Sequence, residues 1–326
     1  MSEANKIKVA IVGGAGYTAG ELIRILLYHP AAELKYIQSN SNNGQPVIAV
    51  HTDLIGDTDL VFMDVNFEDT DVLFLCSGHG KSIDYLNNTA ISKHVKIIDL
   101  SHDFRLKREG NDFVYGLPEL NREQIRVATK IANPGCFATA IQLALIPLAA
   151  AGLLIDEVHI NAITGSTGAG QAPTRTSHFS WRDNNLSVYK AFEHQHLGEI
   201  YQSLRQAQPG FSKDVNFIPV RGNHTRGIFE TAYTKFDGTI GEANDIYSNF
   251  YATHPFVNMA SENPDMKQVV NTNKGLIFLE KHGDKLIIIS CIDNLLKGAS
   301  GQAVQNMNLM FGLDERCGLN LKAIGF

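Results

Sequence analysis

Apolar and polar positions follow the periods of alternating strands and helices through the first part of the chain. Residues 6–12 (KIKVAIV) are a β-branched run typical of a strand, and after a glycine turn the apolar residues of 22–27 recur at helical spacing. Similar short runs at 33–39, 71–77 and 95–101 predict three further strands. Strands separated by helical or loop segments predict a mostly parallel sheet.

The pattern changes from about residue 157. Longer β-rich runs predict a second domain with a largely antiparallel sheet: EVHINAITGST, VNFIPVRG, GIFETAYTKF, GLIFLEK and KLIIISCI. Residues 298–313 return to helical periodicity and are expected to pack back on the first domain. The predicted fold class is α/β, with a Rossmann-type domain formed by 1–137 and 299–326 and an α+β domain formed by 138–298.

Composition and charge narrow the possible partners. The chain has 326 residues, with 28 Lys plus Arg against 34 Asp plus Glu and a net charge of −6. Because it has no basic block, we expect no nucleic-acid partner and no attachment to an anionic membrane. The N-terminal segment lacks the apolar core of a signal peptide, and the apolar stretch 138–155 contains Gln142 and Pro147 and is too short for a membrane span. A cytoplasmic protein is expected.

A glycine string, GGAGYTAG at 13–20, connects the first strand to the first helix. It departs from the usual G-x-G-x-x-G spacing, but its place between strand and helix favours a dinucleotide site over a tight turn without a ligand. An NAD enzyme usually has Asp or Glu at the end of the second strand, where this chain has SNS at 39–41. With no carboxylate there to repel a 2′-phosphate, NADP is the predicted cofactor.

One cysteine is placed as a nucleophile would be. Cys136 follows the turn signal NPG (133–135) and begins an apolar segment with helical spacing, so it lies at or near a helix N-terminus, where a thiolate is favoured. The alternative is a buried thiol that only fills space. A base or acid could come from His194, His196 and Glu199. The His-x-His pair also resembles a metal site, but no third ligand is evident and no C-x-x-C pair is present, so no metal is predicted.

Several motifs in order resemble one enzyme family over nearly the whole chain. They are GGAGYTAGEL, IDLSHDFRL, YGLPELNREQI, NPGCFATA, GSTGAGQAPT, YKAFEHQHLGEI and IDNLLKGASGQAVQNMN. The chain resembles the N-acetyl-γ-glutamyl-phosphate reductases of arginine biosynthesis, within the aspartate-semialdehyde dehydrogenase-like superfamily. The resemblance implies NADPH-dependent reduction of a small acyl phosphate through a thioester on Cys136. The acid–base residue maps to the His-x-His segment, where we favour His194 over His196.

The same resemblance, with the chemistry of the side chains, assigns the remaining site residues. The predicted cofactor contacts are Gly13, Gly14, Gly16, Tyr17, Thr18, Ser39, Asn40, Ser41, Ser77, Gly165, Gly168, Asn294, Lys297 and Gly298. The predicted substrate contacts are Ser101, Arg105, Asn133, Ser166, Glu199, Arg221, His224 and Arg226. Lys297 could instead be a solvated charge at the start of a helix. The second domain is expected to carry catalysis, substrate binding and assembly into a homodimer or homotetramer.

The chain departs from the family pattern in FIPVRGNHTRGI (217–228). Here Arg221 and His224 occupy positions at which the family pattern has mostly apolar residues. An added guanidinium suits a carboxylate, so the acyl group is expected to be succinyl at least as readily as acetyl. Two rival functions stay open. One is an aspartate-semialdehyde or aminoadipate-semialdehyde dehydrogenase, and the other is a non-catalytic dinucleotide-binding regulator.

Overall fold

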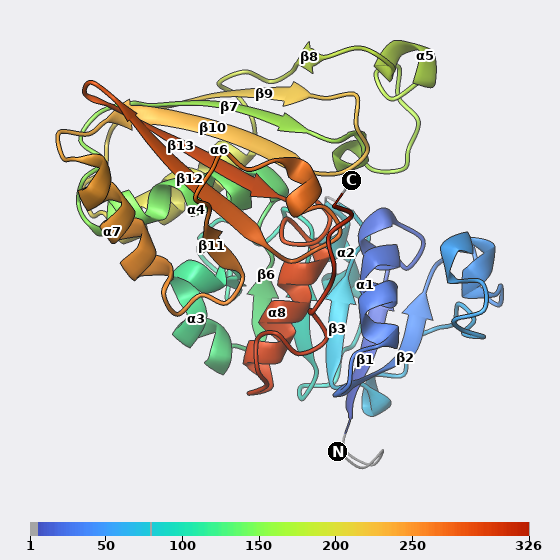
Figure 1. Cartoon of the computed structure of the whole chain (residues 1–326). Coiled ribbons are helices and arrows are strands. Elements are labelled where there is room, and N and C mark those ends of the chain that lie inside the picture. The colour runs from blue at the N-terminus through green and yellow to red at the C-terminus, as the bar shows by residue number, and fades with distance from the viewer. Residues whose placement is uncertain (1–5, 79, 326) are drawn as a thin grey trace. The chain divides into compact units, whose positions relative to one another are not determined.

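The computed structural model describes residues 6–78 and 80–325, and the chain divides into two compact units (Figure 1). Of the described residues, the first unit comprises 6–78, 80–134 and 299–320, and the second comprises 135–298 and 321–325. Residues 135–137 and 321–325 therefore belong to the second unit, whereas the sequence placed them in the first domain. The first of these segments leads directly into a helix whose apolar side chains form the core of the second unit.

The first unit contains a six-stranded sheet with the order β2-β1-β3-β4-β6-β5, in which all neighbouring strands are parallel. The predicted parallel sheet is thus confirmed. Strand β1 lies between two neighbours and is almost wholly buried, which explains its continuous apolar run. The strands are β1 (Ile7–Val12), β2 (Ala32–Gln38), β3 (Val72–Leu75), β4 (Lys96–Asp99), β5 (Val114–Tyr115) and β6 (Lys130–Ala132).

The helices of the first unit include the predicted C-terminal helix. In Figure 1 the red helix α8 lies beside the blue α1, and it contacts both α1 and α3, so its predicted return to the first domain is confirmed. The α-helices are α1 (Tyr17–Leu27), α2 (Lys81–Asn88), α3 (Pro118–Val127) and α8 (Ser300–Met310). Single 3₁₀ turns are η2 (Val47–Ala49), η3 (Thr52–Leu54) and η4 (Phe67–Asp69).

The second unit contains a seven-stranded sheet with the order β11-β12-β13-β10-β7-β9-β8. Its sheet is mixed rather than simply antiparallel: β7 pairs with β9, and β11 with β12, in parallel, while the other four pairings are antiparallel. A helical crossover joins β7 to β9, and such a connection makes two strands parallel. The strands are β7 (Val158–Thr164), β8 (Ser187–Val188), β9 (Val215–Arg221), β10 (Ile228–Lys235), β11 (Val257–Met259), β12 (Gly275–His282) and β13 (Lys285–Ile292).

Helix α4 is the centre of the second unit's core. It contacts two other helices, α6 and α7, and strands β10 and β13, and its residues are buried from Phe137 to Ala149. A helix that is apolar on every side is stable only when it is enclosed in this way. The helices are α4 (Cys136–Ala150), α5 (Phe179–Arg182), α6 (His196–Ala207) and α7 (Ile240–Tyr251), with 3₁₀ turns η5 (Ser166–Ala169) and η6 (Met266–Gln268).

The crossover from β7 through α6 to β9 places candidate site residues at one edge of the sheet. A crossover helix runs opposite to the strands that it connects, so its first residue lies near the edge where those strands end. His196 opens α6, and Thr164 and Arg221 end β7 and β9 as paired residues. Helix α4 also leads into β7, which places its first residue, Cys136, toward the same edge.

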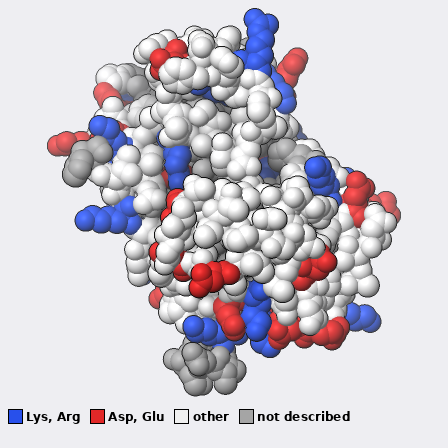
Figure 2. Space-filling view, turned by 90° about the vertical axis from the view of Figure 1, so that its right-hand side faces the viewer, with Lys and Arg blue, Asp and Glu red and all other residues white. Residues whose placement is uncertain are grey.

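The surface carries charges of both signs. On the face shown in Figure 2, Lys and Arg side chains are interspersed with Asp and Glu side chains rather than gathered into a continuous basic patch. Within 6–78 and 80–325, no helix is long and apolar enough to cross a membrane.

Candidate active site

Cys136 is the first residue of α4, and the turn before it is held by a carboxylate. The Gly135 N–H donates to Glu199 Oε2 at 2.9 Å, and the Gly135 carbonyl accepts the first helical hydrogen bond from the Thr139 N–H at 2.8 Å. No acidic residue occupies the first turn of α4. The partial positive charge of the helix N-terminus acts on the Cys136 sulfur, while the Glu199 carboxylate on the preceding peptide opposes part of it.

Two histidine rings pack on Phe137, the residue after Cys136. The ring centroids of His194 and His196 lie 5.5 and 6.3 Å from that of Phe137, and 4.5 Å from each other. Burial, with a smaller contribution from Lys190, lowers the pKa of His194 to about 4. The His194 Nδ1 accepts a hydrogen bond from the His196 N–H at 3.2 Å, so this nitrogen is the unprotonated one. His194 is thus a neutral ring at physiological pH.

His196 has a different electrostatic environment. Its Nε2 lies 3.9 Å from Glu199 Oε1, on the same carboxylate that holds Gly135. Glu199 therefore connects His196 to the turn that carries Cys136.

Tyr189 was not among the residues predicted from the sequence, although it opens the motif YKAFEHQHLGEI. Its ring centroid lies 5.8 Å from that of His194, and the Arg221 guanidinium carbon lies 4.7 Å from the Tyr189 ring. Burial, and then the charge of Cys136, raise the pKa of Tyr189 to about 12, while Arg221 opposes the shift. The phenol oxygen is therefore within electrostatic reach of both the candidate nucleophile and a cation.

The loops after β7 and β9 are joined by hydrogen bonds. The Ser166 N–H donates to the His224 carbonyl at 2.8 Å, and the Gly165 N–H donates to the Gly227 carbonyl at 3.0 Å. Asn294 links both loops, because its Oδ1 accepts from the Gly227 N–H at 2.7 Å while its Nδ2 donates to the Thr167 hydroxyl at 3.0 Å. The predicted residues Gly165, Ser166, Gly168, His224, Arg226 and Asn294 are thus brought together in one loop cluster.

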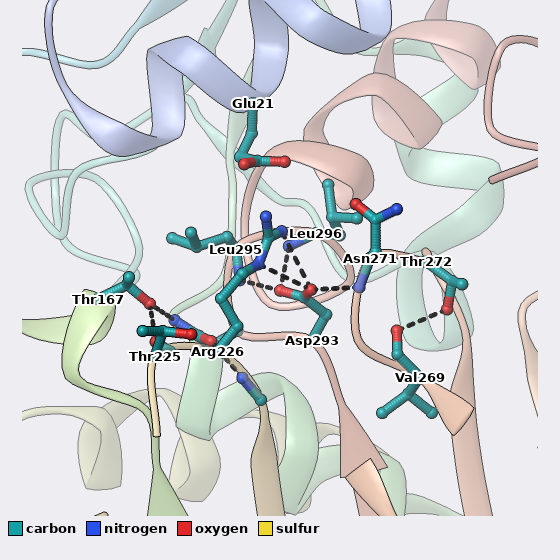
Figure 3. A network of polar contacts seen from close by, with 12 residues as sticks. Glu21, Thr167, Thr225, Arg226, Val269, Asn271, Thr272, Asp293, Leu295 and Leu296 are labelled. Atoms are coloured by element: carbon teal, nitrogen blue, oxygen red, sulfur yellow. Dashed lines mark hydrogen bonds and ion pairs between the residues drawn. The ribbon is translucent and has the colours of Figure 1, made fainter. Parts of the chain in front are cut away.

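Arg226 is anchored by a buried carboxylate that the sequence did not single out. Figure 3 shows Arg226 directed toward Asp293, which is fully buried, and its Nη2 lies 3.0 Å from Asp293 Oδ2. The same carboxylate accepts from the N–H groups of Asn271, Leu295 and Leu296 at 2.7, 2.8 and 3.2 Å. Because several donors share it, Asp293 fixes where the Arg226 guanidinium lies.

Lys297 and Gly298 follow this network in the chain. The Lys297 side chain is fully buried, which excludes the alternative of a solvated charge, and its Nζ lies 6.0 Å from the centre of the Phe256 ring. A cofactor contact by Lys297 stays a prediction. A Cβ at Gly298 would lie 2.8 Å from the Cys136 Cβ. Only glycine allows the backbone to approach the candidate nucleophile this closely.

In the first unit, the glycine turn has the shape that a dinucleotide phosphate needs. Gly13 has a φ of +82°, and a Cβ there would lie 2.6 Å from the backbone of Ser77, so the turn packs tightly on the end of β3. At Gly16, the N-cap of α1, a Cβ would meet nothing closer than 3.8 Å. A side chain would fit there, and its absence leaves room at the helix N-terminus, where Tyr17 and Thr18 form the first turn.

The end of β2 is polar. Ser39 is buried, its hydroxyl accepts from the Asn42 amide at 2.9 Å, and Asn40 and Ser41 are exposed. Residues 39–44 contain no carboxylate. The Gly14 N–H donates to the Gln38 carbonyl at 2.8 Å, which ties this strand end to the glycine turn. The predicted residues of the two segments thus lie side by side.

Ser101, Arg105 and Asn133 form a network that supports a backbone turn. Arg105 is buried, and its guanidinium donates to the carbonyls of Asn133 and Leu100 at 2.8 and 2.9 Å. The Ser101 hydroxyl donates to buried Asp99 at 2.7 Å. The Asn133 amide donates to the Ala299 carbonyl at 3.0 Å. These contacts are structural, and substrate binding by the three residues stays a prediction.

Metal and disulfide chemistry find no support in the part of the chain that the structure describes. Over 6–78 and 80–325, no group of three His, Cys, Asp or Glu side chains is arranged to hold a metal ion. None of Cys76, Cys136, Cys291 and Cys317 is in a disulfide. Burial raises the pKa of Cys76 to about 12, and it also raises that of Cys291. Both of these thiols are inert at neutral pH.

Comparison with known proteins settles the family. The chain is 58% identical over 317 residues to the N-acetyl-gamma-glutamyl-phosphate reductase of Christiangramia forsetii, with 97% of this chain and 99% of that protein covered. It is 59% identical over 321 residues to the protein of the same name from Azobacteroides pseudotrichonymphae, with 98% and 100% covered. The chain belongs to the N-acetyl-gamma-glutamyl-phosphate reductase family. The resemblance predicted from the sequence motifs is therefore confirmed.

Broader matches agree with membership in the reductase family. A family model described as the semialdehyde dehydrogenase NAD binding domain matches residues 8–128, and one described as the dimerisation domain matches 136–294. Aspartate semialdehyde dehydrogenase II from Vibrio cholerae has a TM-score of 0.74 at 17% identity, over 94% of this chain and 99% of that one. The Candida albicans enzyme, solved with NADP, gives 0.70 at 15% identity, over 94% and 98%. These structures share the fold of the reductase.

Proposed function

We propose that the chain reduces an N-acyl-γ-glutamyl phosphate to the N-acyl-glutamate 5-semialdehyde with NADPH and releases phosphate, as a step of arginine biosynthesis. The observation that carries the proposal is Cys136 at the N-terminus of α4 in a chain that matches reductases of this name over nearly its whole length. A thiolate at that position suits an acyl phosphate, because the leaving phosphate is easily displaced.

In the first step, the Cys136 thiolate attacks the acyl carbon and forms a C–S bond as the C–O bond to phosphate breaks. The electron pair of that bond leaves with the phosphate, and the substrate is held as a thioester on Cys136. Covalent catalysis thereby divides one difficult reduction into two easier steps. Glu199 contributes by fixing Gly135, so that the peptide before the nucleophile keeps its place.

In the second step, the thioester carbon is reduced, and a nicotinamide held at the proposed cofactor site would supply the hydride. The negative charge that then develops on the carbonyl oxygen needs donors, which the N–H groups of the first turn of α4 can supply. The C–S bond then breaks, the aldehyde leaves, and the Cys136 thiolate is regenerated. A protonated histidine can donate to the same oxygen as the charge develops.

Of the two histidines, His196 fits this role better, although the sequence favoured His194. The pKa of about 4 leaves His194 without a proton to give at neutral pH, and its Nδ1 is engaged by the His196 N–H. His196 Nε2 lies 3.9 Å from Glu199 Oε1, on the carboxylate that holds the Gly135 N–H before Cys136. We therefore assign His196 as the acid–base group and His194 as a neutral support for the ring beside it.

The cofactor residues fit a dinucleotide, with NADP as our choice. The open position at Gly16 and the first turn of α1 would hold the pyrophosphate. Ser39, Asn40 and Ser41 would meet the 2′-phosphate without a carboxylate to repel it. A homodimeric or homotetrameric state and a cytoplasmic location remain predictions.

Replacement of Cys136 tests the mechanism. Cys136→Ala should abolish turnover in the reverse reaction, from aldehyde, phosphate and NADP, while NADPH affinity from fluorescence titration stays near that of the wild type. Cys317→Ala is the matched control, since this thiol lies far along the chain in the first unit, and it should keep wild-type activity. His196→Asn should lower kcat about a hundredfold to ten-thousandfold and remove one limb of the pH profile.

Other outcomes would select the rival functions. Faster turnover of aspartate or aminoadipate semialdehyde than of any N-acyl-glutamate semialdehyde would make the chain a dehydrogenase of those substrates. NADPH binding without turnover of any aldehyde would identify a regulator. Substantial activity in Cys136→Ala would refute the thioester mechanism.

A further inference from the structure

Arg221 is a cation without an anion. Its Nη1 donates to the Thr176 hydroxyl at 3.3 Å, its guanidinium lies over the Tyr189 ring, and its buried Nε has no hydrogen-bond partner. Among residues 6–78 and 80–325, no carboxylate forms an ion pair with it. Arg221 is half-buried, and a guanidinium removed even partly from water is usually paired with a carboxylate or phosphate, because a lone charge is costly to desolvate.

The surroundings of Arg221 add positive charge and a further unpaired polar group. Arg182 donates to the Arg221 carbonyl at 2.8 Å, and burial and then the charge of Arg221 lower the pKa of Arg182. Thr164 is the strand partner of Arg221 on β7; it is 2% exposed, and its hydroxyl has no hydrogen-bond partner in the described part of the chain. The Arg182 guanidinium is taken up by the carbonyls of Thr176, Arg221 and Gly222, which leaves the Arg221 Nε and the Thr164 hydroxyl as the groups at these strand ends that an anionic ligand would satisfy.

Strand periodicity places Arg221 on the side of the sheet that carries the active site. Arg221 and Phe217 are both at odd positions of β9, so they share one face of the sheet. Phe217 packs against Phe137 and His194, with ring centroids 5.2 and 5.5 Å apart. Arg221 thus lies farther along the same face than Phe217, against the Tyr189 ring.

This position suits the far end of the proposed substrate. The acyl carbon and the phosphate must lie at Cys136, while the N-acyl group is at the opposite end of the glutamyl chain. An acetyl group ends in a methyl that offers nothing to a guanidinium. An acyl group that ends in a carboxylate accepts two parallel hydrogen bonds from it.

We propose that Arg221, supported by Tyr189, binds a terminal carboxylate on the N-acyl group, so that the preferred substrate carries a dicarboxylic acyl group such as N-succinyl. The inference rests on the proposed reductase function and names its substrate class. His224 is not part of the proposed subsite: a Cβ at Gly222 would lie 2.5 Å from its ring, which places the ring back over its own loop. Arg226 is excluded because Asp293 already holds it.

The test compares three aldehydes in the reverse reaction: the N-acetyl, N-succinyl and N-succinamoyl derivatives of L-glutamate 5-semialdehyde. The succinamoyl compound has the shape of the succinyl one but ends in a neutral amide. In the wild type, kcat/KM for N-succinyl should be at least that for N-acetyl and should exceed that for N-succinamoyl about tenfold or more. Arg221→Met should lower the N-succinyl value about tenfold to a hundredfold more than the N-acetyl value.

Arg175→Met is the matched control, because Arg175 is an exposed arginine of the same connection between β7 and β8. It should leave all three kcat/KM values unchanged. Retained N-acetyl turnover shows that Arg221→Met is folded, and if that variant does not fold, the wild-type ranking of the three substrates still decides.

The results that would overturn the inference are distinct from those that would overturn the function. Use of N-acetyl alone, equal use of succinyl and succinamoyl compounds, or equal losses for all substrates in Arg221→Met would refute the carboxylate subsite. Equal decreases in kcat/KM for all substrates would instead indicate that Arg221 binds the α-carboxylate or the phosphate. Turnover of none of the three would refute the proposed function itself.

Discussion

Replacing Asp293 with asparagine changes one atom type in a buried network and nearly preserves the side-chain volume. Asp293 Oδ1 accepts from the N–H groups of Leu295 and Leu296, and Oδ2 accepts from Arg226 and from the N–H of Asn271 (Figure 3). Whichever way an asparagine side chain turns, its NH₂ group faces two donors. The variant therefore loses two hydrogen bonds and the charge that neutralises Arg226.

The expected cost follows from the burial of the pair. Asp293 is fully buried and the Arg226 side chain is 18% exposed, so water can form few hydrogen bonds in place of those that the substitution removes. Removing one partner of a buried ion pair costs about 3–5 kcal/mol. For a domain of this size, 1 kcal/mol shifts Tm by about 2–4 °C, so Asp293→Asn should melt roughly 6–20 °C lower.

Trp181 makes the assay specific. It is the only tryptophan of the chain and lies in the second unit, so its fluorescence during urea or thermal unfolding reports that unit. Asp284→Asn is the matched control, because that side chain is 57% exposed beside Lys285 and should change stability by less than about 0.5 kcal/mol. If Asp293→Asn unfolds at the wild-type urea midpoint, Asp293 does not hold the network as we argue.

Two further changes test the cofactor site and the core. Ser39→Asp should raise the ratio of kcat/KM for NADH over NADPH by repelling a 2′-phosphate, and Ser39→Asn should not; equal ratios in the two variants would contradict the assignment. Glu230 is fully buried with no hydrogen-bond partner within 6–78 and 80–325, and burial raises its pKa well above the usual value. The folded protein therefore loses stability as pH rises above about 4, the unfolded pKa, until the folded pKa is reached. Glu230→Gln removes this loss. The urea midpoint of the variant should therefore exceed that of the wild type by an amount that grows from pH 5 to pH 8. A difference in midpoint that stays constant over this range would show that Glu230 is charged in the native state.

Much of the fold could be predicted because the apolar runs in the sequence coincide with the segments that are buried in the structure. The run at 6–12 becomes β1 and the apolar segment after Cys136 becomes α4, since both are enclosed by their neighbours. Strand direction in the second unit could not be predicted from alternation, which is the same in parallel and antiparallel strands. The pairing of β7 with β9 depends on the helix between them.

The candidate site was only partly accessible from the sequence. The positions of Cys136 and the histidines followed from short motifs, but the difference between His194 and His196 depends on burial and on Glu199. The contact of Arg221 with Tyr189 joins residues on separate segments and has no local signature. The burial of Lys297 likewise depends on residues distant in sequence, so the sequence left a solvated charge open as the alternative to a cofactor contact.

The parallel crossover between β7 and β9 also constrains how the chain can change its length during evolution. One residue inserted within β9 would turn Arg221 to the opposite face of the sheet, because side chains alternate along a strand. An insertion in the connection 171–186 would leave the ends of both strands in place. The chain can therefore lengthen between β7 and β8 where the contacts of Thr176 and Arg182 with Arg221 are kept, while the length of β9 is fixed by the side chain at its end.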